Sequence, residues 1–105
     1  METTKALTDV LEQRKNRTIT VSFKEGTDQS YDDVYLAMAA PCYIKHAIKY
    51  AGIDASPLYK MISPPAEWPF SEKCWKPESV RQDLIHAVNL LIDEIESIDR
   101  MAEGA

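Results

Sequence analysis

The fold is decided by residues 80–100, VRQDLIHAVNLLIDEIESIDR. Apolar side chains recur there at spacings of three and four, which is typical of an amphipathic helix with one buried face. The expected buried stripe consists of Val80, Leu84, Ala87, Val88, Leu91, Ile95 and Ile98, widened by Ile85 and Ile92. The expected solvent face consists of Gln82, His86, Asn89, Asp93, Glu96 and Arg100. Pro77 suits the first helical position, and we expect the tail after Arg100 to fray.

Two further helices are predicted upstream of this one. The first runs from Thr4, which can cap it, to about Arg14. The middle helix starts with a cap at Ser30 and runs through Tyr50. Pro41 lies inside the middle helix and is expected to kink or split it, because proline removes a backbone hydrogen bond. The apolar stripe of the first helix consists of Leu7, Val10 and Leu11.

The segments between the helices are of two kinds. Residues 18–23 (TITVSF) alternate in polarity and are rich in β-branched side chains, which indicates a short strand. Such a strand must pair with a second extended segment or another subunit, or lie as irregular chain on the helices. Residues 63–76 are rich in proline and aromatic side chains and are expected to be extended, after a helical turn near residues 58–62. The prediction is a mainly α, three- to four-helix fold in which residues 1–105 form a single domain.

Composition excludes several classes of function. The net charge of −5 and the pI of about 4.9 argue against nucleic-acid binding, which requires clustered Lys and Arg. The first residues do not resemble a signal peptide, and no window is long and apolar enough for a membrane span. Cys42 and Cys74 stand outside any CxxC spacing, so we expect reduced, partly buried thiols rather than a disulfide or a metal site. A cytoplasmic protein, in a bacterial host, is expected.

Few residues suggest catalysis. With three glycines in the chain there is no phosphate-binding loop, and His46 and His86 stand alone, each expected to face solvent or cap a helix. The acidic residues Asp93, Glu94 and Glu96 have two interpretations. They form a solvated face, or they resemble the Mg²⁺-binding acidic pairs of all-helical MazG-type nucleoside triphosphate pyrophosphohydrolases. Only that resemblance implies a cofactor, Mg²⁺; otherwise we expect no cofactor and no catalytic residue.

The aromatic residues of the extended segment are the candidate binding residues. Trp68, Phe70 and Trp75 are expected to seal the core, with the indole nitrogens hydrogen-bonded or at the surface. Alternatively, they form a binding groove together with Tyr31 and Tyr35, because tyrosine and tryptophan are frequent in binding hot spots. The sequence leaves both interpretations open.

Four runs in the second half of the chain form a pattern: WPF at 68–70, CWKP at 74–77, RQDLIHA at 81–87 and IDEIESIDR at 92–100. They are similar to the W-P-W, W-W-K-P, R-R-D-L-V-K-A and I-A-E-I-E-R-L-D-R runs of a family of small phage and prophage proteins. Residues 10–14 and 37–40 resemble its start and its alanine-rich middle helix. Phe70, Cys74 and the segment 18–23 depart from it. The resemblance implies a phage origin and supplies no catalytic residue.

The leading hypothesis is a small phage accessory protein that acts without catalysis, by binding a host protein or a signalling nucleotide, and that inhibits a bacterial defence system. One alternative is a MazG-like pyrophosphohydrolase or a degenerate, nucleotide-binding relative. A second alternative is a structural protein that forms a homodimer or larger homo-oligomer through the broad apolar face of the last helix.

Overall fold

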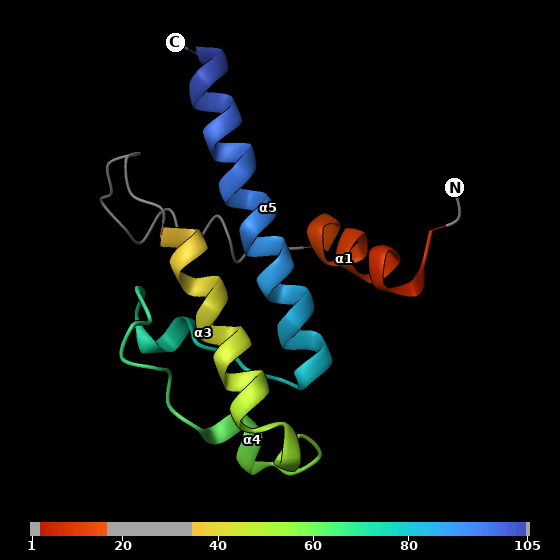
Figure 1. Cartoon of the computed structure of the whole chain (residues 1–105), viewed down its shortest axis with the longest axis vertical. Helices are drawn as coiled ribbons and strands as arrows, with labels where there is room; N and C mark the ends of the chain where they lie inside the picture. Colours follow the sequence, from red (N-terminus) through yellow and green to blue (C-terminus); the bar gives the residue numbers. More distant parts are fainter. Residues whose placement is uncertain (1–2, 17–34, 105) are drawn as a thin grey trace.

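The computed structural model describes residues 3–16 and 35–104, and this part of the chain is mainly helical (Figure 1). No strand occurs within these two ranges. The predicted strand at 18–23, the predicted cap Ser30 and the candidate residue Tyr31 lie outside the described residues. The helices are α1 (Lys5–Asn16), α3 (Tyr35–Lys49), α4 (Leu58–Met61) and α5 (Val80–Gly104), with short 3₁₀ turns at Ala51–Ile53 and Glu72–Cys74. None of these helices is both long and apolar enough to cross a bilayer.

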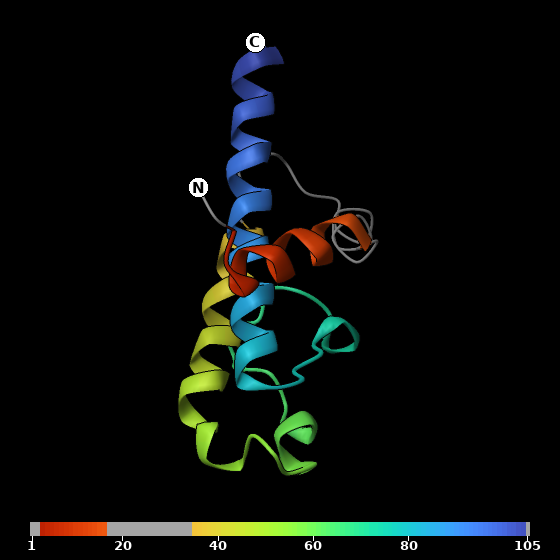
Figure 2. The same cartoon turned by 90° about the vertical axis from the view of Figure 1, so that its right-hand side faces the viewer.

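Helices α3 and α5 lie side by side and run in opposite directions (Figures 1 and 2). Small side chains at their contact, Ala39 and Ala40 on α3 and Ala87 on α5, are almost completely buried. Small residues let two helix backbones approach closely, and the larger Leu36 and Leu90 fill the space beside them. This pair forms the centre of the core.

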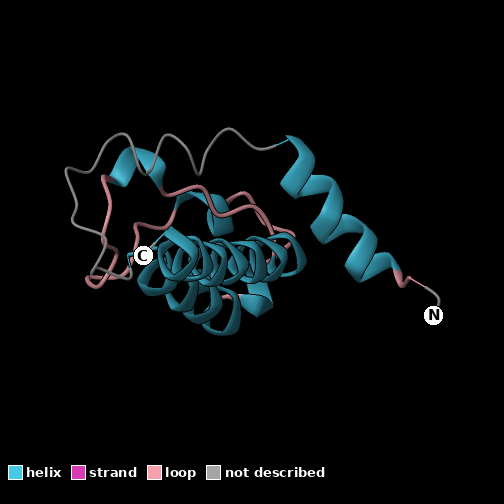
Figure 3. Cartoon of the chain, turned by 90° about the horizontal axis from the view of Figure 1, so that it is seen from above, coloured by secondary structure: helices cyan, strands magenta, loops and turns pink. Residues whose placement is uncertain are grey.

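Helix α1 lies across α5 on another side, as the view from above shows (Figure 3). It begins as predicted, because the Thr4 hydroxyl accepts a hydrogen bond from the backbone N–H of Leu7 at 3.2 Å. It ends at Asn16, two residues later than predicted. Only Val10 of its apolar stripe is buried, whereas Leu7 and Leu11 are exposed. Contact between α1 and α5 therefore depends less on apolar side chains than the stripe indicated.

The segment between α4 and α5 covers the core with aromatic side chains. Trp68 and Trp75 are 8% and 9% exposed and surround Tyr43 of α3, which stacks on Trp75 with ring centroids 4.7 Å apart. The indole N–H groups donate to backbone carbonyls, that of Trp68 to Ser71 at 3.0 Å and that of Trp75 to Ile62 at 2.9 Å. The expected sealing role of the two tryptophans is confirmed, together with the helical turn at α4.

Two predicted boundaries of α5 are wrong, and the split that was one of two outcomes expected at Pro41 does not occur. Helix α5 begins at Val80 instead of Pro77, because the Ser79 hydroxyl accepts from the N–H of Gln82 and forms the cap. Helix α3 continues through Pro41 without a split; the proline sits on the exposed side, where water can satisfy the carbonyl that loses its donor. At the other end of the chain, α5 remains helical to Gly104.

Candidate functional site

The apolar stripe of α5 faces away from the core, which contradicts the sequence prediction. Five of the residues expected to be buried are 40–57% exposed; we call them the α5 apolar face, and they are Leu84, Val88, Leu91, Ile95 and Ile98. Asn89 and Asp93, predicted to face solvent, are buried. Ala87 and Ile85 are buried as expected. The helix is thus rotated about its axis relative to the prediction, and its most hydrophobic line is accessible.

The α5 apolar face has the spacing of a helix-pairing seam. Its residues follow one another at intervals of four, three, four and three, which is the seven-residue repeat of helices that pack side by side. At 1.5 Å per residue the face is roughly 21 Å long. The largest apolar patch on a monomer commonly measures about 300–600 Å² and is often functional. The face therefore has the pattern of a surface that binds another helix.

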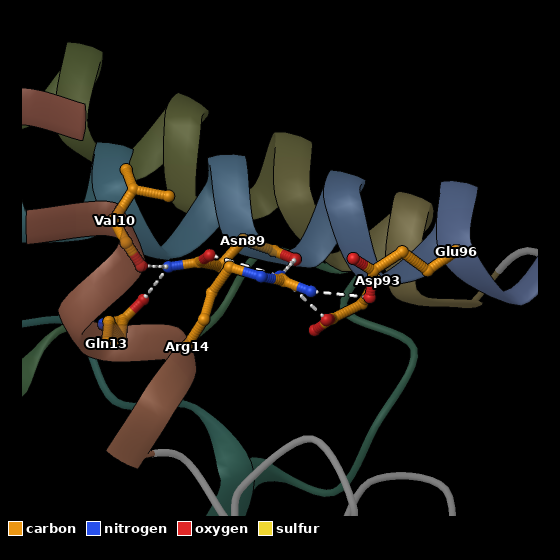
Figure 4. A network of polar contacts seen from close by, with 6 residues as sticks. All are labelled: Val10, Gln13, Arg14, Asn89, Asp93 and Glu96. Atoms are coloured by element: carbon orange, nitrogen blue, oxygen red, sulfur yellow. Dashed lines mark hydrogen bonds and ion pairs between the residues drawn. The ribbon is translucent and has the colours of Figure 1, made fainter. Parts of the chain in front are cut away.

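The buried polar side of α5 is explained by a hydrogen-bond network with α1 (Figure 4). Arg14 donates from one guanidinium nitrogen to Asp93 at 3.0 Å and to the side-chain and backbone oxygens of Asn89 at 3.3 Å. Its other terminal nitrogen donates to Glu96 at 2.6 Å. The Asn89 amide donates in turn to Gln13 at 2.6 Å and to the carbonyl of Val10 at 3.3 Å. Because these polar groups have hydrogen-bond partners, they can be buried at the contact between α1 and α5, while the apolar stripe lies on another side of α5.

Sequence reasoning assigned no role to Arg14 and placed Asn89 at the surface. A signal was present, since Asn89, Asp93 and Glu96 recur at intervals of four and three and so form one line along the helix. One arginine can reach all three from a crossing helix. The sequence does not say that the arginine comes from α1, because that depends on where α1 packs.

The three acidic residues of the magnesium hypothesis point to different partners. Asp93 and Glu96 both pair with Arg14. The carboxylate of Glu94 lies on another side of α5 and accepts from the backbone N–H of Ala37, in the first turn of α3, at 3.4 Å. Within residues 3–16 and 35–104 no three His, Cys, Asp or Glu side chains are grouped as metal ligands would be.

The candidate aromatic residues are brought together, but mostly inside the molecule. Trp68 and Trp75 lie in the core cluster, whereas Tyr35 and Phe70 are half-buried at its edge and meet edge to face at 6.3 Å. The two tryptophans therefore present little surface to a partner. Of the candidate aromatic residues that the structure describes, Tyr35 and Phe70 leave aromatic surface accessible.

A second buried polar cluster lies near the start of α5. Asp83 is 1% exposed and accepts from the hydroxyl of Tyr59 at 2.5 Å and from the backbone N–H of Glu78 at 2.9 Å. Burial raises the pKa of Asp83 above its ordinary value, and the hydrogen bonds from Tyr59 and Glu78 oppose this effect. Burial and the Asp83 hydrogen bond also raise the pKa of Tyr59. His46, predicted to face solvent or cap a helix, is instead buried against Tyr59, whose carbonyl lies 3.0 Å from Nε2.

The hollow beside this cluster is small. It measures about 80 Å³ and is bordered by Asp83, His86, Tyr43 and Cys74, among others. Pockets for drug-sized ligands begin at roughly 300 Å³, so this hollow is too small for a nucleotide. Cys74 is half-buried and Cys42 is buried, and both thiols are free, as expected.

Comparisons with known proteins found no matching family model, no matching curated protein and no matching solved structure.

Proposed function

We propose that the protein acts without catalysis, by binding a helix of a second polypeptide chain on the α5 apolar face. The observation that carries the proposal is the exposure of Leu84, Val88, Leu91, Ile95 and Ile98 in a seven-residue repeat. A partner helix with apolar residues at the same spacing would insert its side chains between these five, as paired helices do.

The cost of leaving this face in water supports the proposal. Fully burying a Leu, Ile or Val side chain stabilises a protein by roughly 1.5–3 kcal/mol relative to full exposure, and each of the five is about half exposed. A helix that served only the fold would carry its polar side outward. Here Asn89 and Asp93 face inward, and Arg14 offsets the cost of burying them. An association function explains why the apolar side is kept accessible.

The resemblance of residues 68–100 to small phage and prophage proteins extends this proposal to a cellular role. We infer a phage accessory protein that works in the cytoplasm of a bacterial host and inhibits a defence system by binding. The half-buried pair Tyr35 and Phe70 is a second contact surface under the same hypothesis. Trp68 and Trp75 would support that surface from within the core.

The pyrophosphohydrolase alternative has less support. It requires Asp93, Glu94 and Glu96 to bind one Mg²⁺ ion, whereas Arg14 occupies two of these carboxylates and Glu94 faces α3. That alternative predicts Mg²⁺-dependent release of pyrophosphate from a nucleoside triphosphate, lost on Asp93→Asn. Our proposal predicts no release above that of the Asp93→Asn variant.

Site-specific photo-crosslinking tests the proposal. A photoreactive amino acid replaces Ile95, and in the matched control it replaces Met61, an exposed apolar residue on α4. After irradiation in the cells that produce the protein, we expect a covalent adduct with a polypeptide from position 95 and none from position 61. The absence of an adduct from position 95, or equal adducts from both positions, would contradict a binding role for the α5 apolar face.

A further inference from the structure

We infer that the helix bound on the α5 apolar face is α5 of a second copy of this chain, in antiparallel orientation. The inference rests on the proposed function and names its partner. Three observations carry it: the residue types in the repeat, the projection of α5 beyond the core, and the charges at the two ends of the face.

The residue types fit a pair of identical helices. β-branched Val88 and Ile95 alternate with Leu84 and Leu91 along the face, and Ile98 at its end departs from the alternation. In parallel pairs, β-branched residues at one core position with leucine at the other favour two strands, so this pattern bears on the number of helices and not on their orientation. A twofold axis brings the same face of both copies together, so one repeat supplies both sides of the contact.

The projection of α5 explains why a second copy is needed. The C-terminal part of α5 extends beyond α1 and α3 (Figures 1 and 2). Ile98 lies in that part and is more than half exposed. A helical extension without packing is marginal in water, because most helical stability in proteins comes from burying an apolar face. In an antiparallel pair, the projecting C-terminal end of each α5 packs against the N-terminal part of the other α5. That N-terminal part is packed in the core of the second copy.

The charges select the antiparallel orientation. When Val88 of one copy lies opposite Leu91 of the other, Leu84 lies opposite Ile95 and Arg81 lies opposite Ile98 of the second copy. Arg81 then lies beside Asp99 of the second copy, on the same side of the interface, at both ends of the pair. A parallel pair would place Arg81 against Arg81, and Glu94 of one copy beside Asp99 of the other. Opposite charges meet in the first arrangement and like charges meet in the second.

The area agrees with a dimer of moderate affinity. Two copies of the face bury on the order of 800 Å² of apolar surface between them, and the flanking residues raise the total toward about 1,200 Å², the lower limit for specific protein–protein interfaces. We therefore expect a dissociation constant in the micromolar range, on the order of 10 μM.

Sedimentation equilibrium of the full chain between about 1 and 200 μM tests the inference. The wild type is expected to approach twice the chain mass of 11.9 kDa at high concentration. Ile95→Glu introduces a charge into the interface, opposite Leu84 of the second copy, and is expected to weaken the dimer about 100-fold or more. The matched control Met61→Glu, an exposed apolar residue on α4, is expected to dimerise like the wild type. A wild type that remains at 11.9 kDa throughout, or equal effects of Ile95→Glu and Met61→Glu, would overturn the inference.

Asp99→Arg decides the orientation. In the antiparallel pair the new arginine meets Arg81 of the second copy, and we expect roughly fivefold weaker dimerisation. In a parallel pair it would meet Glu94 and dimerisation would become stronger, which would overturn the antiparallel assignment. The substitution is placed at Asp99 because Arg81 also pairs with Asp9 of its own chain at 2.8 Å. If the wild type is a monomer but position 95 cross-links to a different protein, the proposed function stands and this inference fails.

Discussion

Arg14 is the side chain that joins α1 to α5 through several hydrogen bonds and ion pairs. Its guanidinium group pairs with Asp93, which is 4% exposed, and with the accessible Glu96. The three donor–acceptor contacts to Asn89 and Asp93 also satisfy polar atoms that have left water. Docking of α1 is therefore mainly a polar event, with Val10 as its buried apolar residue.

Arg14→Ala is expected to lower the free energy of unfolding by about 3 kcal/mol, because it leaves the Asp93 carboxylate buried without its cation. Adding Asp93→Asn should restore part of that loss. The control Lys15→Ala removes an exposed contact to Glu12 at 4.0 Å and should cost less than about 0.5 kcal/mol. Urea unfolding followed by circular dichroism measures all three. Equal losses for Arg14→Ala and Lys15→Ala would show that the Arg14 network contributes nothing to stability.

Asp83 makes the stability of the fold depend on pH in a defined direction. Burial raises its pKa above the usual 3.8, so the folded state holds the proton more tightly than the unfolded chain. The stabilisation from protonated Asp83 is full below pH 3.8 and is lost as the pH rises from there through the raised pKa. Asp83→Asn removes this contribution.

The unfolding free energy of the wild type minus that of Asp83→Asn is thus expected to fall as the pH increases through this window, and to be constant above it. Urea titrations at a series of pH values measure the difference. The pKa values of Asp9 and Glu67, which Lys5 and Lys45 lower, affect both proteins equally and cancel. A difference that rises with pH would mean that the hydrogen bonds from Tyr59 and Glu78 outweigh the effect of burial.

At the scale of elements, the aromatic segment between α4 and α5 acts as part of the core. Trp75 stacks on Tyr43 and bonds the carbonyl of Ile62, so it joins α3 to the chain that follows α4. Trp75→Ala is expected to destabilise the fold by about 3–5 kcal/mol. Phe70→Ala, at the half-buried edge, should cost about half as much. Circular dichroism in urea measures both; a cost below about 0.5 kcal/mol for Trp75→Ala would contradict the core position.

The elements also show how far a sequence can be taken. The helical class, the cap at Thr4, the turn at α4 and the two tryptophans of the core follow from local chemistry, and these predictions are confirmed. The buried side of α5 does not follow, because periodicity shows that a helix has an apolar side but not what covers that side. Three small residues, Ala39, Ala40 and Ala87, decide where α3 packs. Alanine contributes little to a hydrophobic pattern, so the leucines and isoleucines of α5 determine which side the pattern predicts to be buried.

At the scale of the whole molecule, the polar network with α1 and the alanine-rich contact with α3 together determine which side of α5 is left accessible. Arg14 satisfies Asn89 and Asp93 on one side of α5, and α3 covers Ala87 and Leu90 on another. The remaining side is the α5 apolar face, with its five residues in a seven-residue repeat. As a surface, the candidate site is anticipated only by the homo-oligomer alternative, since the leading interpretation places the same residues in the core.

Denaturant unfolding of Ile95→Glu, followed by circular dichroism at micromolar concentration, tests this central claim most directly. Since Ile95 is 57% exposed, the account predicts a folded helical protein that unfolds cooperatively. Its free energy of unfolding should lie within about 1 kcal/mol of the wild-type value extrapolated to low protein concentration. If Ile95 belonged to the core, the buried charge would cost several kcal/mol and the variant would be largely unfolded in buffer. That result would contradict the exposure of the α5 apolar face, and with it the proposed binding function.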